Sequence, residues 1–361
     1  MKILVAGDWH SELHEAAAAR ALETLGHTVA RFAWHDYFSV KGGSVAARMN
    51  SLWCRAQNKY LWGRQVDRLN RDLVNLAKRF QPEGIFIYRG THVYPKTLRD
   101  LRAAVPGVVL VGYNNDDPFA PGHVPGLWRY FIAGLQELDL PLAYRHANLD
   151  DFRRAGARRV ELLRSWYMPE RNHPVVLSAE ERERYGCDVV FIGHYEPDSR
   201  LACLEAAVAA GYQVRLYGPP YEWEPVLKNH KVLSRLLPVR LVWGEEYNLA
   251  LCGAKAALVF LSKLNRDTYT RRSFEIPATG VAMLSEYTDD LASLFRPDIE
   301  ALYFKSIPDF IDQLNRVMRD EESRSAIAKA GLMRVHEDRH SVVARMEQLV
   351  QWISEIKDDR A

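Results

Sequence analysis

Short apolar runs alternate with amphipathic stretches along the first half of the chain. Residues Ile3 to Ala6 form the first run, and the stretch from Gln65 to Phe80 has apolar residues at helical spacing on one face. Strands that alternate with helices predict a parallel, doubly wound sheet. The other strands expected in this half are residues 28–32, 84–88, 108–113, 142–144 and 160–163, and the other helices are 15–25 and 95–104.

The alternation breaks at residues 165–186, where two prolines and a charge-rich run predict a linker or domain boundary. It then restarts, so the pattern predicts two Rossmann-like units in tandem with a cleft between them. The strands expected in this half are 188–192, 213–217, 241–243, 256–261, 281–284 and 301–304, and the helices include 199–210, 271–279 and 341–357.

Bulk properties agree with this organisation and exclude several classes of protein. A chain of 361 residues is longer than one hydrophobic core usually supports. The sequence has no run of about 18 apolar residues, so no membrane span is expected. The N-terminus lacks the features of a signal peptide. The four cysteines are scattered, which argues against a metal site or a disulfide framework. We therefore expect a cytoplasmic protein, and the net charge of +2 does not indicate nucleic-acid binding.

Loops that follow strands carry the candidate chemistry, because open parallel sheets bind ligands at the carboxyl ends of their strands. The first loop, residues 6–11, lacks GxGxxG, which argues against a dehydrogenase; His10 either faces the cleft or belongs to a simple turn capped by Ser11. In the second loop, Asp116 and Asp117 are candidate catalytic residues that orient sugar hydroxyls or act as a base. The alternative is an Asx-turn before the following proline.

The loop that opens the second half is a candidate anion site. Gly193, His194 and Arg200 lie between a strand and a helix, where main-chain N–H groups favour an anion. A cation in the first helical turn is unfavourable for the helix dipole, so a diphosphate partner would explain Arg200. The alternative is a surface ion pair between Arg200 and a neighbouring carboxylate.

Residues 263–280 are the most informative loop. They combine four cations with two carboxylates, Asp267 and Glu275, that stand eight residues apart. A nucleotide sugar needs both kinds of group: Lys263 and Arg272 suit its diphosphate, and carboxylates accept hydrogen bonds from its hydroxyls. The alternative is a solvated charged helix, which the apolar residues of this segment disfavour.

The segment from Arg48 to Arg79 has eight basic and two acidic residues, with aromatic residues interleaved. It is a candidate for peripheral contact with a membrane or an anionic acceptor. The alternative that we favour from sequence is the solvated face of an amphipathic helix pair.

Several stretches resemble the CgeB-like (spore maturation) proteins, a glycosyltransferase-like group similar to the retaining glycosyltransferases of family four. The resemblance rests on RRSFEIPATGVAMLSE (271–286), VVFIGHYEPDSR (189–200) and VWGEEYNLALCGAKAALVF (242–260), and more loosely on PEGIFIYRGTHVYPKTLRDLR (82–102). It implies that Glu275 holds the donor ribose, that Asp267 contacts the donor sugar or its phosphate, and that Trp243 and Tyr247 lie near the nucleobase. In this chain Asp267 replaces the usual first glutamate and His194 replaces the usual arginine.

The resemblance further implies a GT-B fold, with an acceptor-side domain at residues 1–170 and a nucleotide-sugar domain at 171–340. A final helix, 341–361, would cross back to the first domain. We therefore expect a glycosyltransferase of bacterial polysaccharide or glycoconjugate synthesis, which moves a hexosyl or deoxyhexosyl group from a UDP-, GDP- or dTDP-linked donor to a glycan, lipid-linked or protein acceptor. We expect retention of configuration, neither a metal nor a cofactor, and a cytoplasmic location that can include the inner membrane face. A silent nucleotide-sugar-binding protein and a non-hydrolysing epimerase stay open as alternatives.

Overall fold

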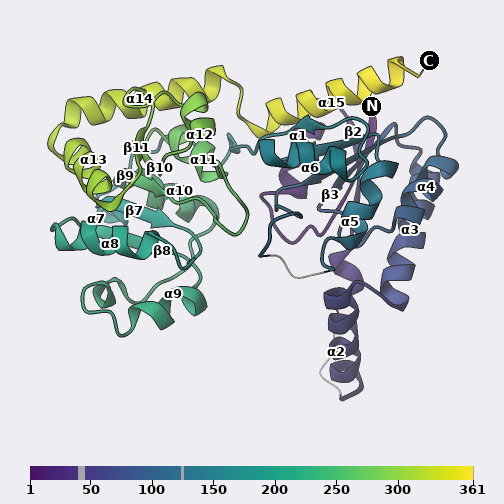
Figure 1. Cartoon of the computed structure of the whole chain (residues 1–361), viewed down its shortest axis with the longest axis horizontal. Helices are drawn as coiled ribbons and strands as arrows, with labels where there is room; N and C mark the ends of the chain where they lie inside the picture. The colour runs from purple at the N-terminus through teal and green to yellow at the C-terminus, as the bar shows by residue number, and fades with distance from the viewer. Residues whose placement is uncertain (40–44, 123–125, 361) are drawn as a thin grey trace. The chain divides into compact units, whose positions relative to one another are not determined.

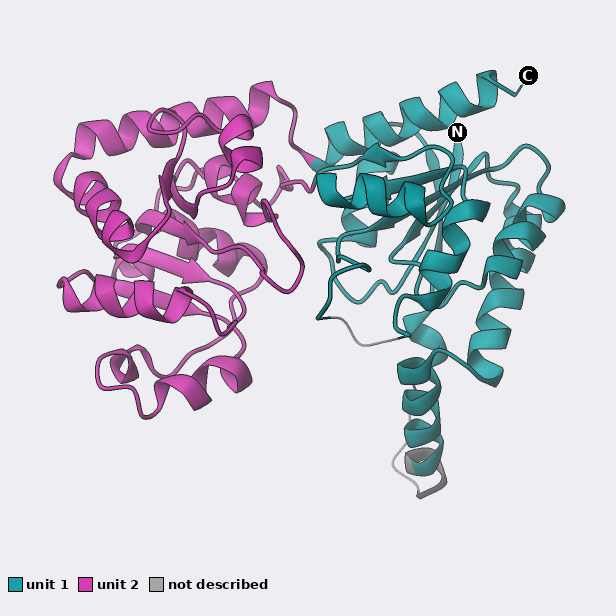
Figure 2. Cartoon of the chain, in the orientation of Figure 1, with its two compact units in different colours: residues 1–164, 342–361 teal, residues 165–341 magenta. Residues whose placement is uncertain are grey.

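The computed structural model describes residues 1–39, 45–122 and 126–360, without the side chains of residues 45–48 (Figure 1). The chain divides into two compact units, which Figure 2 distinguishes by colour. Unit 1 comprises residues 1–164 and 342–361, and unit 2 comprises residues 165–341.

Unit 1 is built on a six-stranded parallel sheet in the order β2-β1-β3-β4-β5-β6. The register places Leu4 beside Ile85 and Ile85 beside Leu110, so side chains of one kind form rows across the sheet. These strands are nearly continuous apolar runs because helices cover both faces of the sheet. The strands are β1 (Lys2–Gly7), β2 (Thr28–Ala33), β3 (Gly84–Tyr88), β4 (Val109–Asn114), β5 (Leu140–Ala143) and β6 (Glu161–Leu162).

The helices of unit 1 cover the two faces of this sheet. Helices α3 and α4 pack together over the face that carries Ile85, and α1 packs with α15 over the face that carries Gly84, where Ile353 of α15 fills the space that a side chain at Gly84 would need. The helices are α1 (Glu15–Thr24), α2 (Val45–Tyr60), α3 (Arg64–Phe80), α4 (Pro95–Ala104), α5 (Arg129–Gly134), α6 (His146–Arg154) and α15 (Val342–Asp358), with short 3₁₀ turns at His35–Tyr37 and Leu135–Glu137.

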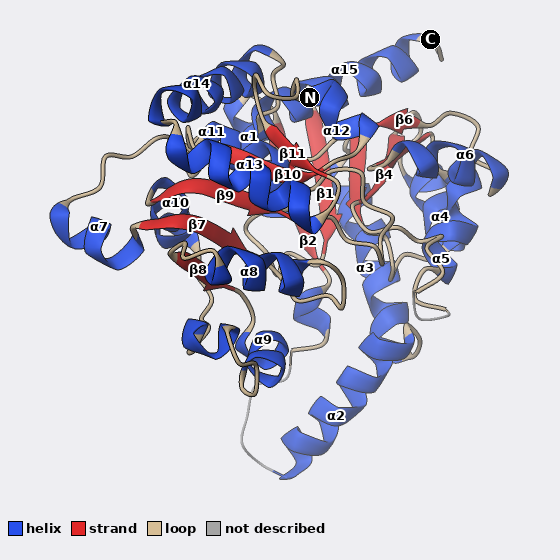
Figure 3. Ribbon diagram, turned by 60° about the vertical axis from the view of Figure 1, so that its left-hand side comes forward, coloured by secondary structure: helices blue, strands red, loops and turns tan. Residues whose placement is uncertain are grey.

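Unit 2 repeats the design with five parallel strands in the order β11-β10-β9-β7-β8. Helices α8 and α13 cover one face, and α10 and α11 contact the sheet on the other (Figure 3). The strands are β7 (Cys187–Ile192), β8 (Val214–Tyr217), β9 (Ala254–Val259), β10 (Ala282–Glu286) and β11 (Leu302–Phe304). The helices are α7 (Ala179–Tyr185), α8 (Arg200–Ala209), α9 (Pro220–Leu227), α10 (Gly244–Cys252), α11 (Arg272–Ala278), α12 (Asp289–Leu294), α13 (Ile307–Arg319) and α14 (Glu321–Glu337), with a 3₁₀ turn at Leu233–Leu236.

Two parallel-sheet α/β units confirm the predicted fold class, and one local expectation is corrected. Residues 241–243 do not form a strand: beside β8 only Arg240 makes a single bridge, to Tyr217, and Trp243 lies in solvent. The boundary between the units falls at the start of the segment 165–186, as expected, and the segment also contains α7, whose Ser178 and Glu181 form a capping box at its N-terminus.

In both sheets the strand order reverses at an equivalent strand, β1 in unit 1 and β7 in unit 2. In unit 1 the chain leaves β1 for β2 on one side and returns to β3 on the other, and in unit 2 β7 stands between β8 and β9 in the same way. Ligands of doubly wound sheets bind at the carboxyl ends of the strands at this switch point. The loops after β7 and β9 are therefore the place to look for a site in unit 2.

Candidate functional site

The loop after β7 begins at Gly193. This glycine lies close to the neighbouring strand β8 and to the side chain of Arg272. Its N–H donates to the carbonyl of Tyr217 at 2.9 Å, and its own carbonyl accepts from the indole of Trp223 at 2.9 Å. A methyl group at this position would lie 3.4 Å from Cζ of Arg272. The guanidinium of Arg272 therefore lies directly against the first residue of the loop, at the switch point.

Arg271 and Arg272 form a pair of uncompensated cations at the start of α11. Within the part of the chain that the structure describes, neither makes an ion pair with a carboxylate, and the buried Nε atom of each has no hydrogen-bond partner. Buried polar atoms normally find partners, and buried charge without a counter-ion is costly. Two guanidinium groups in this state suit an anion with several oxygens, such as a diphosphate. Arg272 was predicted from sequence, whereas Arg271 was counted among the cations of the loop but not chosen.

Glu275 lies one turn further along α11, and its carboxylate is half satisfied. The side chain is 5% exposed, and Oε2 accepts a hydrogen bond of 2.6 Å from the hydroxyl of Tyr247 on α10. Oε1 has no hydrogen bond among the described residues, so it is free to accept one from a ligand hydroxyl. Desolvation and the charge of Glu275 raise the pKa of Tyr247 well above its usual value, against the lowering effect of Arg272 and Arg271. The hydroxyl therefore stays protonated and acts as a donor.

Trp243 stands immediately before α10, one turn from Tyr247. Its side chain is 61% exposed, and Gly244, which follows it, adopts a positive φ of 58° that favours glycine. An exposed indole at this place presents a flat apolar face, which suits stacking against an aromatic base.

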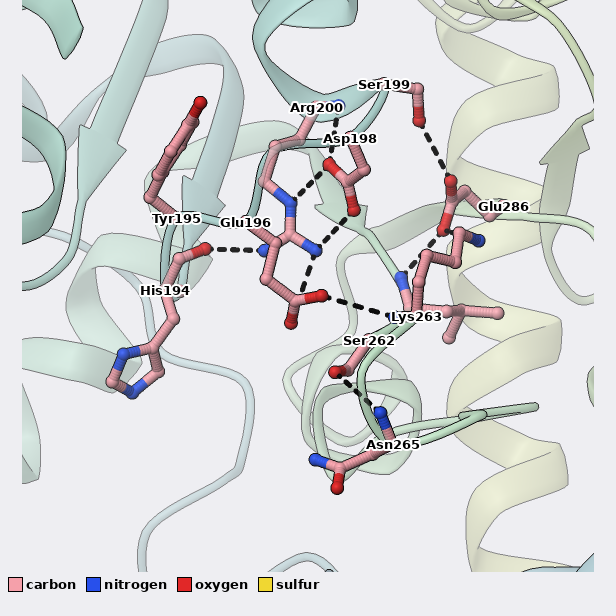
Figure 4. A network of polar contacts seen from close by, with 12 residues as sticks. His194, Tyr195, Glu196, Asp198, Ser199, Arg200, Ser262, Lys263, Asn265 and Glu286 are labelled. Atoms are coloured by element: carbon pink, nitrogen blue, oxygen red, sulfur yellow. Dashed lines mark hydrogen bonds and ion pairs between the residues drawn. The ribbon is translucent and has the colours of Figure 1, made fainter. Parts of the chain in front are cut away.

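Arg200 is enclosed within the loop and does not present a free guanidinium. It is 3% exposed; Nε and Nη2 each donate to the carboxylate of Asp198 at 2.7 Å, and Nη1 donates to the carbonyl of His194 at 2.6 Å. Glu196 lies 3.6 Å from Nη2 (Figure 4). These contacts match the ion-pair alternative, although the pair is buried and not at the surface. In the structure Arg200 braces the loop, and its contact with a phosphate stays a prediction.

Glu286, at the end of β10, connects the loops that follow β7 and β9. Its carboxylate accepts hydrogen bonds from the main-chain N–H of Leu261 at 2.8 Å, the hydroxyl of Ser199 at 3.0 Å and Nζ of Lys263 at 3.1 Å (Figure 4). The main-chain N–H of Lys263 donates in turn to Glu196. The Lys263 side chain is largely exposed, so it can exchange Glu286 for a ligand at small cost.

Two other residues predicted in unit 2 have different surroundings. The imidazole of His194 points away from Arg200 and lies 3.0 Å from Glu222 of α9, so it does not join the cluster at α11 (Figure 4). Asp267 lies partly buried in the loop after β9, where its N–H donates to the carbonyl of Ser262 at 2.9 Å.

In unit 1 the two adjacent aspartates after β4 have different roles. Asp116 forms a 2.6 Å ion pair with Arg89, and both side chains are partly exposed. Asp117 is fully buried, and its carboxylate accepts from the N–H of Phe119 at 3.0 Å and from Asn148 at 2.8 Å. Asp117 thus closes the Asx-turn that was the alternative, and its role as a catalytic residue stays a prediction.

The loop after β1 is held by a carboxylate at the start of α1 that sequence reasoning missed. Glu15 is buried, and Oε1 accepts from the N–H of Asp8 at 2.9 Å, in space left free by the missing side chain of Gly7. Burial raises the pKa of this carboxyl despite its main-chain hydrogen bonds. The available signal was an acidic residue at the first position of a helix. His10 is exposed, with its ring 5.4 Å from that of His35.

The described part of the chain has neither a metal-binding cluster nor a membrane-spanning helix. Among residues 1–39, 45–122 and 126–360, no group of three or more histidine, cysteine or acidic side chains is placed to hold a metal ion. No helix within the same ranges has the length and apolar character needed to cross a bilayer.

Part of the chain matches a known protein family. Residues 200–351 match the model of a family described as "Glycosyl transferase-like". A comparison with curated proteins gave no match.

Solved structures share the fold over nearly the whole chain. HepE of Anabaena in complex with UDP-glucose is 13% identical with a TM-score of 0.66, and the match covers 98% of this chain and 100% of that one. Sucrose-phosphate synthase of Thermosynechococcus elongatus is 13% identical with a TM-score of 0.68, and 98% of each chain is covered. Trehalose 6-phosphate synthase of Burkholderia multivorans is 12% identical with a TM-score of 0.62 and coverage of 100% and 99%. The chain therefore has the two-unit fold of GT-B glycosyltransferases, with a glycosyl transferase-like region at residues 200–351.

Proposed function

We propose that this protein is a glycosyltransferase that binds a nucleotide-sugar donor in unit 2. The observation that carries the proposal is the pair Arg271 and Arg272, which has no counter-ion and lies beside Gly193 at the switch point. The glycosyl transferase-like region and the fold neighbours crystallised with UDP and UDP-glucose support it.

Each group in the site has a proposed part in binding the donor. The two guanidinium groups bind the diphosphate and stabilise the charge that develops on it as the sugar leaves. Oε1 of Glu275 accepts a ribose hydroxyl, while Tyr247 holds the carboxylate in place through Oε2. Trp243 stacks on the base, and Lys263 adds a mobile cation.

The acceptor side and the stereochemistry are finer parts of the proposal. We propose that Asp116 positions the acceptor and that Asp267 contacts the donor sugar. Transfer with retention of configuration is carried over from the resemblance to family-four enzymes. The anomeric coupling constant of the product, measured by NMR as it forms, distinguishes retention from inversion.

Calorimetric titration with UDP, GDP, dTDP and UDP-glucose tests donor binding. We expect one nucleotide family to bind, and Arg272→Gln to weaken it roughly 10- to 150-fold, because a hydrogen bond to a charged group contributes about 1.5–3 kcal/mol. Glu275→Gln should weaken the nucleoside diphosphate through the ribose contact while leaving inorganic pyrophosphate binding nearly unchanged.

Matched controls are Arg316→Gln and Glu321→Gln, which change the same residue types at exposed positions of unit 2. If no nucleotide binds, or if the controls lose as much affinity as the site variants, the proposed donor site is wrong. Release of nucleoside diphosphate only when an acceptor is supplied separates a transferase from a silent binding protein. Conversion of the donor sugar without any acceptor would instead indicate an epimerase.

A further inference from the structure

Helix α2 is joined to the rest of unit 1 by polar contacts. Gln57 is 2% exposed, and its Oε1 accepts from the N–H of Gln65 at 2.9 Å. Asn58 lies 2.7 Å from the ring nitrogen of the buried His92, and the carbonyls of Tyr60 and Leu61 accept from Arg129. These contacts fix the rotation of the helix about its own axis, since turning it would break all of them.

The same rotation places large apolar side chains in solvent. Thirteen large hydrophobic residues are exposed in the described part of the chain, and five of them lie within residues 49–62. They therefore form a cluster, whereas single exposed apolar residues are common on any protein surface. On α2 they recur at helical spacing along one face, and the helix extends away from the body of unit 1 (Figures 1 and 3). The rings of Trp53 and Trp62 meet edge to face, 6.0 Å apart. The five residues are Met49 (68% exposed), Leu52 (65%), Trp53 (54%), Tyr60 (56%) and Trp62 (51%).

The charge around this cluster has one sign. Residues 37–66 contain no aspartate or glutamate, and Arg55, Lys59 and Arg64 are exposed beside the apolar residues. None of the three makes an ion pair within the described residues. Arg55 and Lys59 are four residues apart, so they stand on one flank of the apolar face of α2.

We propose that this α2 surface, the five exposed apolar residues with Arg55, Lys59 and Arg64, docks on an anionic lipid bilayer. An amphipathic helix with tryptophan and leucine on one face and basic residues beside it lies in the interface plane of a membrane. Tryptophan and tyrosine are favoured at the level of the head groups, where an apolar ring body meets a wet edge. This proposal stands on the surface of unit 1 alone and does not depend on the proposed donor site.

A second copy of the chain is a less suitable occupant. A two-fold dimer would bring the same patch face to face, with three cations on each side and no carboxylate to pair with them. Like charges juxtaposed across an interface oppose association. An anionic bilayer satisfies both the apolar and the basic part of the surface.

Vesicle flotation tests the proposal with the full-length protein. We expect binding to phosphatidylcholine vesicles that contain phosphatidylglycerol, weaker binding to pure phosphatidylcholine, and a decrease as salt rises. Each basic residue near an anionic surface raises the partition coefficient roughly fivefold, so Arg55→Gln with Lys59→Gln should lower it roughly 25-fold. Trp53→Ala with Trp62→Ala should lower it at least about tenfold on both vesicle types.

The controls change comparable residues at exposed sites of unit 2: one aromatic residue in Tyr221→Ala, and two cations in Lys228→Gln with Lys231→Gln. They should bind vesicles like the unaltered protein, and circular dichroism should show that all variants keep their helices. The proposal is overturned if the unaltered protein stays with the buffer at low salt, or if the α2 variants bind as the controls do. It is also overturned if the tryptophan variant turns a dimer into a monomer without any change in vesicle binding.

Discussion

His92 is a buried histidine that the fold holds uncharged, and acidification should therefore destabilise unit 1. Its Nδ1 lies 2.9 Å from the hydroxyl of Thr91, and its Nε2 lies 2.7 Å from Oδ1 of Asn58 on α2. Because Oδ1 can only accept, Nε2 carries the proton of the neutral ring. Burial, together with the charge of Arg89, lowers the pKa of His92 from 6.5 to about 3.

The size of the effect follows from linkage between proton binding and folding. The unfolded chain takes up the proton near pH 6.5, whereas the folded protein resists it down to about pH 3. The free energy of unfolding therefore falls as the pH drops below about 6.5 and stops falling near pH 3. For this one group the loss between pH 7.5 and 5 is about 2 kcal/mol.

The comparison that isolates this loss is with His92→Gln, which can keep the donor to Asn58 but does not titrate. Urea unfolding at pH 7.5 and 5, read by hydrogen exchange on peptides from residues 84–94, reports on unit 1 alone. The unaltered protein should lose about 2 kcal/mol more than the variant between the two pH values.

An exposed histidine supplies the control, because His10→Gln should change the pH dependence hardly at all. Equal losses in the unaltered protein and His92→Gln would refute the reasoning. They would mean that His92 is protonated in the folded protein without the loss of folding free energy that its burial implies.

Three further substitutions test other parts of the structure. Tyr247→Phe removes the donor to Glu275 and should weaken nucleoside diphosphate binding roughly tenfold in calorimetry, with a similar melting temperature in the free protein. Arg200→Ala leaves the carboxylate of Asp198 enclosed without its partner and should lower the free energy of unfolding by about 3–5 kcal/mol in urea titrations, a loss that a surface cation would not cause. Ile353→Ala opens a cavity beneath α15 and should cost about 2–5 kcal/mol by the same measurement, whereas the exposed Met333→Ala should cost less than about 1 kcal/mol.

The sheets could be predicted from sequence because burial on both faces leaves a direct trace. A strand such as β3, Gly84–Tyr88, is apolar along its whole length, and no tertiary information is needed to recognise it. The helix α7 left an equally local signal in Ser178 and Glu181, although the surrounding prolines and charges concealed it. The loops that hold the candidate site were found from their position after strands, where ligand sites lie, and from the charged residues that they contain.

The direction in which a side chain points was beyond the reach of sequence. Arg200 has acidic neighbours in the chain, and only the packing of the loop shows that its guanidinium is enclosed by them. The apolar residues of α2 have helical spacing, which normally indicates a core-facing stripe. In the structure, distant residues such as His92 contact the polar side of that helix instead, and the apolar residues are exposed.

Unit 2 is inserted into unit 1, and this affects the order in which the protein can fold. The chain leaves unit 1 after residue 164 and returns at Val342, and the two crossing segments lie side by side where the N–H of Tyr167 donates to the carbonyl of His340. During synthesis every residue of unit 2 is joined to the chain before α15 is made. Until then the first unit lacks the apolar face of its last helix, so the half that is synthesised first is the last to be completed.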